Sequence, residues 1–156
     1  AMCRYAGYLS KSFLPEDHRR ALELLKEASE LGSFEAAFAL ACLYEEGKCG
    51  VAKCRKKVRE YHLIAALRGC IVSQQKLANE ELDRGNYEIG FLWLKTAAKA
   101  GDDLAMTSLR GSYEKGLVSR EAYNDTVTKH RDAKAAMTSE LREEARMCHL
   151  GRDAIP

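Results

Sequence analysis

Proline is almost missing from this sequence, which has only Pro15 and Pro156 among 156 residues. Proline breaks helices because it lacks a backbone N–H and clashes with the preceding turn. Its scarcity, together with abundant Ala, Leu, Glu and Lys, favours helix throughout the chain. Apolar residues make up 46% of the sequence, enough for a continuous core. We therefore expect an all-α protein.

Long apolar runs and an excess of one charge are missing as well. No stretch approaches the ~20 apolar residues of a membrane-spanning helix, so we expect no membrane partner. The net charge of +2 is far from the dense basic surface of a nucleic-acid-binding protein, so we expect no nucleic-acid partner. The opening Ala1-Met2-Cys3 lacks a signal-peptide pattern and leads directly into a helical pattern, as expected for a segment of a longer protein.

The six cysteines show no spacing typical of a disulfide framework. Their positions do not recur with the helical pattern, and Cys42 lies in an apolar helical face, where a free thiol behaves as a small hydrophobe. Disulfides are rare in reducing compartments. We therefore expect reduced thiols and a cytoplasmic, intracellular location.

A repeated unit of two helices is the main feature of the sequence. Each unit ends in a glycine preceded by small residues, and Gly32, Gly69 and Gly101 are 37 and 32 residues apart. The same intervals relate Leu40 to Leu77 and to Leu109, and Tyr44 recurs as Tyr113. Several landmarks in one register indicate a true repeat.

Each unit is expected to pair a helix A, which carries the leucine, with a helix B, which carries the small residues. Small pairs such as Ala65/Ala66 allow close helix approach, and Tyr44 and Tyr113 fill the wider gap. The expected helices A lie near 1–11, 35–46, 72–84 and 104–115. The expected helices B lie near 17–31, 54–68 and 86–100.

The last element differs, because no Gly or Pro interrupts the chain from Ser119 to about Arg146. The spacing of three to four residues predicts one long amphipathic helix with Ser119 as N-cap. It replaces a fourth helix B and is expected to seal the open end of the stack. Its inner stripe is expected to comprise Tyr123, Val127, His130, Met137, Leu141, Ala145 and Cys148, with His130 hydrogen-bonded in the core. The predicted organisation is repeats over 1–118, a capping helix over 119–148 and a tail over 149–156.

These landmarks resemble the Sel1-like repeats, a variant of the tetratricopeptide class. The resemblance covers roughly residues 1 to 118 and implies a right-handed α-solenoid that serves as a scaffold or adaptor. The sequence departs from the family pattern at Cys54, which replaces a loop Asp, and at Arg110, which replaces a small residue and suggests a looser final pair. The second unit carries the fullest match, at Ala36, Leu40, Tyr44, Glu46, Gly47, Gly50, Val51, Tyr61, Ala65, Ala66 and Gly69.

In such solenoids the helices A line the concave face. Residues of helices A that are not landmarks are therefore expected to meet a partner protein or peptide, unless they are ordinary solvated residues. Gln75 and Asn79 can hydrogen-bond an extended peptide backbone, and Phe38 can be an apolar anchor. This helix-A surface comprises Arg4, Phe38, Cys42, Gln75, Lys76, Asn79, Thr107 and Ser108.

Two other candidate sites are weaker. Cys49, Cys54, His62 and Cys70 form a loose set of possible zinc ligands, but His62 and Cys70 are roughly 12 Å apart along a helix, too far for one tetrahedral site. We therefore expect no metal. A basic run could meet an acidic partner or RNA, although a solvated helix face is the simpler interpretation. The run comprises Lys53, Arg55, Lys56, Lys57 and Arg59.

No catalytic motif is present, so no catalytic residue and no cofactor are predicted. Cysteine-rich relatives linked to β-lactam binding carry a cysteine pair in every repeat, whereas Ser29, Ala66 and Ala98 occupy the matching position here. A hydrolase or β-lactam-binding protein remains an alternative, as does a substrate-recruiting part of a ubiquitin-ligase-like protein. A homo-oligomer through the exposed first helix, with Tyr5, Tyr8 and Leu9, is a third possibility.

Overall fold

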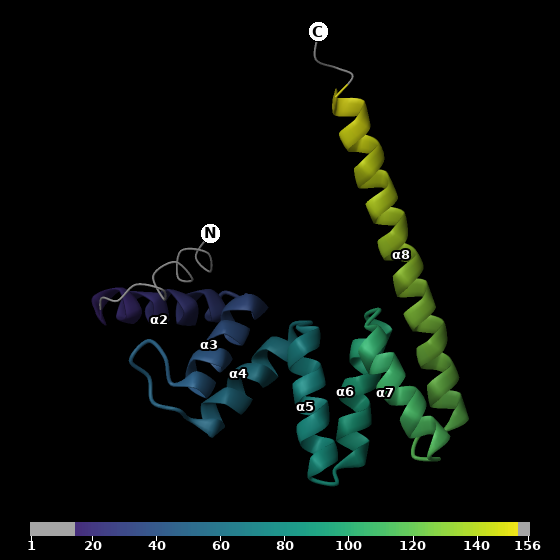
Figure 1. Ribbon diagram of the computed structural model, residues 1–156, viewed down its shortest axis with the longest axis horizontal. Helices are drawn as coiled ribbons and strands as arrows, with labels where there is room; N and C mark the ends of the chain where they lie inside the picture. Colours follow the sequence, from purple (N-terminus) through teal and green to yellow (C-terminus); the bar gives the residue numbers. More distant parts are fainter. Residues whose placement is uncertain (1–14, 153–156) are drawn as a thin grey trace. The chain divides into compact units, whose positions relative to one another are not determined.

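The computed structural model describes residues 15–152, and side chains over residues 16–140. This part of the chain is helical throughout, with no strand, as the composition predicts (Figure 1). The expected helix near 1–11, with Arg4, lies outside the described residues. The helices are α2 (Pro15–Glu30), α3 (Phe34–Glu46), α4 (Arg55–Leu67), α5 (Ile71–Asp83), α6 (Tyr87–Lys99), α7 (Asp103–Glu114) and α8 (Arg120–Arg152).

These helices agree with the predicted ones to within a few residues, except that α8 continues to Arg152. Helices α3, α5 and α7 are the helices A of the repeat, and α2, α4 and α6 are the helices B. The chain divides into two compact units between Trp93 and Leu94. Helices α2 to α5 and the first half of α6 belong to the first unit, and the remainder of α6 with α7 and α8 to the second.

Helix ends are set by local chemistry that the sequence carries. Ser33 and Asp102 cap α3 and α7, accepting hydrogen bonds from the backbone N–H groups of Ala36 and Ala105 at 3.1 and 2.7 Å. Ser119 Oγ accepts from the N–H of Ala122 at 3.2 Å, so its predicted N-cap role is confirmed. The three closing glycines all adopt the left-handed conformation that ends a helix without a Cβ penalty, with φ of 102° at Gly32, 93° at Gly69 and 92° at Gly101.

The landmark leucines form the core. Leu40, Leu77 and Leu109 are 0, 2 and 0% exposed and are among the largest fully buried side chains of the described residues. Leu40 packs in one cluster with Ala28, so a helix-A leucine meets the small residue of the preceding helix B. The predicted register is therefore confirmed by burial at each repeat.

The tyrosine positions repeat a contact between helices A and B. Tyr44 of α3 stacks on Tyr61 of α4 with ring centroids 5.7 Å apart and planes 10° apart. Tyr113 of α7 stacks on Tyr123 of α8 at 4.5 Å and 6°. Helix α8 thus lies beside α7 as a helix B lies beside its helix A. That it seals the stack remains a prediction.

Arg110 lies beside the stacked rings of this last pair, where its Nε donates to Tyr123 Oη at 3.4 Å. Apart from this contact, α7 and α8 approach each other along far less of their length than α3 and α4 do, as expected of a looser final pair. The inner stripe of α8 includes Thr126, which is fully buried and donates to the Ala122 carbonyl at 2.8 Å. Val127 and Met137 are 37 and 51% exposed, although the Met137 sulfur lies against the turn at Gly101, on the predicted inner side of α8.

Replacing Leu77 by Ala tests the packing of the repeat. A cavity at a fully buried leucine lowers the free energy of unfolding by about 2–5 kcal/mol, whereas Leu67→Ala, at a side chain 71% exposed, changes it by less than about 0.5 kcal/mol. Urea unfolding followed by circular dichroism measures both. Equal losses for the two variants would contradict the assigned core.

Candidate functional site

The helix-A surface of the first compact unit is partly used for packing. Phe38 is half-buried against the cluster of Ala37, Ala65 and Cys70, and its ring meets His62 edge-on at 5.9 Å between centroids. Cys42 is also half-buried, and burial raises the pKa of its thiol. These two side chains therefore present only part of their surface to a partner.

The polar members of this surface lie on α5. Lys76 Nζ forms an ion pair with Glu45 Oε1 of α3 at 2.5 Å, and this contact holds the pKa of Glu45 below its usual value. Asn79 is exposed and Gln75 is half-buried. The structure thus brings the charged end of Lys76 to the C-terminal end of α3.

The remaining members lie in the second compact unit, on α7. Thr107 and Ser108 are both exposed. Thr107 Oγ1 donates to the Asp103 carbonyl at 2.9 Å, and the Ser108 carbonyl accepts from Ser112 Oγ at 2.9 Å. Both bonds are local contacts within one helix.

A groove of about 570 Å³ lies in the first compact unit between α3, the start of α4 and α5. Val58 and Tyr44 supply apolar surface, and both are buried to 7% exposure. We call it the α3–α5 groove. Its lining comprises Tyr44, Glu45, Lys53, Cys54, Arg55, Val58, Arg59, Lys76, Glu80, Asp83 and Arg84.

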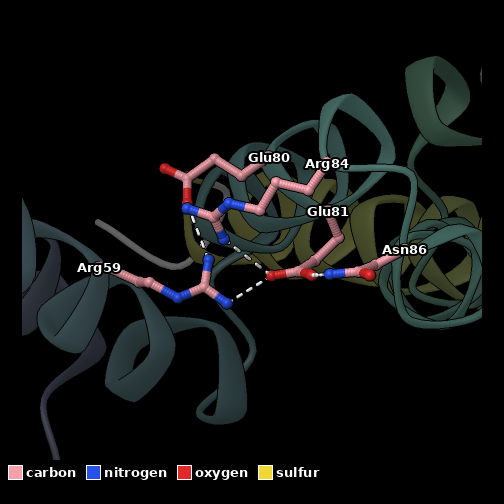
Figure 2. A network of polar contacts seen from close by, with 5 residues as sticks. All are labelled: Arg59, Glu80, Glu81, Arg84 and Asn86. Atoms are coloured by element: carbon pink, nitrogen blue, oxygen red, sulfur yellow. Dashed lines mark hydrogen bonds and ion pairs between the residues drawn. The ribbon is translucent and has the colours of Figure 1, made fainter.

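One side of the groove is an ion network between α4 and α5 (Figure 2). Arg59 of α4 donates to Glu80 at 2.9 Å and also to Glu81. Glu81 further accepts from Arg84 Nη1 at 3.2 Å and from Asn86 Nδ2 at 2.7 Å. The hydrogen bonds from Asn86 and Arg59 hold the pKa of Glu81 below its usual value. Figure 2 shows the guanidinium of Arg59 reaching the carboxylates of Glu80 and Glu81.

Glu81 occupies the tyrosine position of the repeat, a correspondence that the sequence analysis missed. It follows Leu77 by four residues, as Tyr44 follows Leu40 and Tyr113 follows Leu109. A buried carboxylate there replaces the aromatic stack by ion pairs to the neighbouring helix. A search for charged residues at landmark offsets would have revealed it.

Polar residues also occupy two other positions of the contact between α4 and α5 that are apolar in the other repeats. His62 precedes the small pair by three residues, where Leu25 and Leu94 stand in the other helices B. Ser73 stands where helix A elsewhere carries Ala36. His62 Nδ1 and Ser73 Oγ are hydrogen-bonded at 3.0 Å, and both residues are buried. Burial, followed by the charge of Lys76, lowers the pKa of His62.

This histidine–serine pair does not form a usable catalytic dyad. Ser73 is 0% exposed, so a substrate has no path to its hydroxyl. Among the described side chains, His62 Nε2 has no hydrogen-bond partner, so no third group orients the ring. A general base needs access to substrate and an orienting contact. The pair is part of the helix packing.

The other histidine of interest, His130 on α8, has the hydrogen-bonded environment that was predicted. Its Nδ1 lies 2.9 Å from the Ala98 carbonyl and its Nε2 lies 3.1 Å from Asp103 Oδ1. Both ring nitrogens therefore have partners, and the side chain joins α8 to α6 and α7.

The candidate zinc ligands are not brought together. No group of three or more His, Cys, Asp or Glu side chains within the described part of the chain could hold a metal ion. Cys49 and Cys70 are buried, and Cys54 is half-buried. His62 is bonded to Ser73 instead.

The residues of the basic run have different roles. Lys57 Nζ donates to Tyr44 Oη at 3.3 Å and lies 4.9 Å from the centroid of that ring, and Arg59 belongs to the ion network. Lys56 is exposed outside the groove, whereas Lys53 and Arg55 line it. The run therefore serves partly to hold the structure and partly to form the groove.

A family model named Sel1 repeat matches residues 1–33, 34–70 and 73–102. The chain belongs to the Sel1 repeat family. Sel1 repeats are generally protein–protein interaction modules and non-catalytic scaffolds. No curated protein sequence matches the chain. Over residues 15–152, no helix is long and apolar enough to cross a membrane.

Two solved structures have a similar fold. One is a protective antigen of uropathogenic Escherichia coli that displays an SLR fold, with a TM-score of 0.59, 22% identity and 83% of the present chain covered. The other is a Sel1 repeat protein from Oxalobacter formigenes, with a TM-score of 0.56, 26% identity and 81% covered. The chain spans 29% and 56% of the lengths of these two proteins.

Acidification tests the buried polar pair. Because the folded state lowers the pKa of His62, the unfolded chain binds its proton more readily. Stability from this residue is then present above the ordinary pKa of about 6.5 and is lost as pH falls through that value. The double variant His62→Leu with Ser73→Ala should show a smaller loss between about pH 7.5 and about pH 5.5. Urea unfolding at both pH values measures it, and an unchanged pH dependence would refute the assignment.

Glu81→Gln is expected to lower the thermal unfolding midpoint more than Glu80→Gln does. Glu81 is buried and accepts from Arg59, Arg84 and Asn86, whereas the Glu80 side chain is 30% exposed and partly solvated. Removing the charge from the buried Glu81 weakens more contacts than removing it from Glu80 does. Differential scanning calorimetry measures the midpoint of each variant. A larger fall in the midpoint for Glu80→Gln than for Glu81→Gln would contradict this ranking.

Proposed function

We propose that this chain is a protein-binding scaffold that holds a segment of a partner protein on its helix-A surface. The surface in the first compact unit comprises Phe38, Cys42, Gln75, Lys76 and Asn79. Arg4, and Thr107 and Ser108 of the second compact unit, are proposed as further partner-binding residues. The main support is the set of polar side chains on α5, backed by the buried Leu77 and Ala78 of the same helix.

The proposed mechanism is preorganisation. The α5 residues stand on a helix whose position is set by packing and by the Arg59–Glu80 ion pair at 2.9 Å. The amide of Asn79 can donate to and accept from an extended peptide backbone. Side chains held in place before binding lose less entropy when the partner arrives. Affinity then depends on the partner's sequence, because the scaffold itself changes little.

The triple variant Gln75→Ala, Lys76→Ala and Asn79→Ala tests this proposal. The wild-type chain, attached to beads, captures partners from a lysate, and quantitative mass spectrometry compares what each variant retains. Loss of several polar contacts should lower partner capture by about tenfold or more. Circular dichroism confirms that the variants remain helical.

The matched control is Glu27→Ala, Lys56→Ala and Glu60→Ala, three exposed residues on helices B. It changes the same number of polar side chains on another face. Unchanged capture by the helix-A variant, or equal losses for the two triple variants, would overturn the proposed surface.

A further inference from the structure

Some charged side chains of the α3–α5 groove are paired with one another, and others are not. Lys76 is paired with Glu45 at 2.5 Å. Arg59 and Arg84 are paired with Glu80 at 2.9 and 3.7 Å and with Glu81 behind it. The charges of these groups balance one another, and all of the groups except Glu81 line the groove, from α3, α4 and α5. They give it shape without leaving a net charge there.

Lys53 and Arg55 remain on the side formed by the loop and the start of α4. Both are exposed, and neither forms an ion pair with any residue that the structure describes. Asp83, on the α5 side, makes no ion pair with either cation among those residues. The groove therefore presents two available cations on one side and one carboxylate on the other.

The position of these cations is not explained by helix stability. Positive side chains in the first turn oppose the helix dipole, and the first turn of α4 contains no acidic residue. Cys54, at its N-cap, makes no capping hydrogen bond with its side chain, and the same holds for Cys70 at the N-cap of α5. A negatively charged occupant of the groove would relieve this unfavourable arrangement.

The apolar surface of the groove is rigid. Tyr44 is stacked on Tyr61 and bonded to Lys57, and Val58 is buried beside it. The volume of about 570 Å³ falls within the range of sites that hold small ligands or a few side chains. One apolar side chain flanked by carboxylates would match both the surface and the cations.

A nucleic-acid backbone fits this groove less well. Asp83 lines it, and its carboxylate would face the phosphates of a bound strand. Like charges brought together in a partly closed site repel. A peptide can meet Asp83 with its backbone N–H groups instead.

We propose that the α3–α5 groove binds an acidic segment of a partner protein, with partner carboxylates on Lys53 and Arg55 and an apolar partner side chain on Val58 and Tyr44. This inference rests on the proposed scaffold function and adds the chemistry of the partner. The groove shares only Lys76 with the helix-A surface, so the two surfaces can be tested separately.

The test uses a fluorescein-labelled peptide of Glu and Ser with one central Leu, and a second peptide with Gln in place of every Glu. Fluorescence polarisation of the wild-type chain should show binding of the Glu peptide, weakening as salt rises, and at least about tenfold weaker binding of the Gln peptide. Lys53→Glu with Arg55→Glu should weaken Glu-peptide binding by about tenfold or more.

Lys56→Glu is the matched control, because Lys56 is exposed in the same helical turn but does not line the groove. It should change the affinity by less than about twofold. A loss equal to that of the groove variants would mean attraction by bulk charge and would overturn the proposal. Circular dichroism of each variant shows that it remains helical.

Three further results would overturn the proposal. They are equal binding of the Gln peptide, no binding of either peptide, and tighter binding of an oligouridine RNA that depends on Lys53 and Arg55. Gln75→Ala with Asn79→Ala should leave Glu-peptide binding unchanged. If the Glu peptide fails to bind while partner capture still depends on the helix-A surface, the groove proposal falls and the scaffold proposal stands.

Discussion

Close packing of a buried leucine against small residues of a neighbouring helix sets the geometry of this protein. Leu40 packs with Ala28 in the first cluster, and Leu77 and Leu109 are buried at the same register position. Small side chains let the helices approach closely, and a left-handed glycine turns the chain into the next helix. The side chains proposed to meet a partner stand on helices that this packing positions.

The contact between α4 and α5 departs most from that pattern. Glu81 replaces the tyrosine, His62 replaces a leucine and Ser73 replaces an alanine, and all three are buried. Ion pairs and a histidine–serine hydrogen bond therefore join these two helices where apolar or aromatic contacts join the others. Departures from a repeat's own rules tend to concentrate at functional sites, and the α3–α5 groove lies beside this contact.

Sel1 repeats are generally protein–protein interaction modules, whereas specificity depends on individual side chains. In this chain, several of the side chains proposed to set specificity lie in the loop before α4 and at the start of that helix. Cys49 is buried within this loop at a φ of 54°. The loop is longer than the turns from α2 to α3 and from α4 to α5. Lys53 and Arg55 follow Cys49 and line the groove. Loop variation on a fixed helical frame is a common way for repeat proteins to diversify binding.

The sequence alone determined the helices, the register of Leu40, Leu77 and Leu109, and the cap at Ser119, because these depend on local periodicity and backbone chemistry. Only the tertiary structure decided that Arg59 reaches Glu81, that His62 pairs with Ser73, and that Phe38 packs inward. Those contacts join different helices, and their partners depend on how far each side chain reaches across the packed interface. The repeat pattern predicts which positions are buried, but it does not predict how a polar residue at such a position finds its partner.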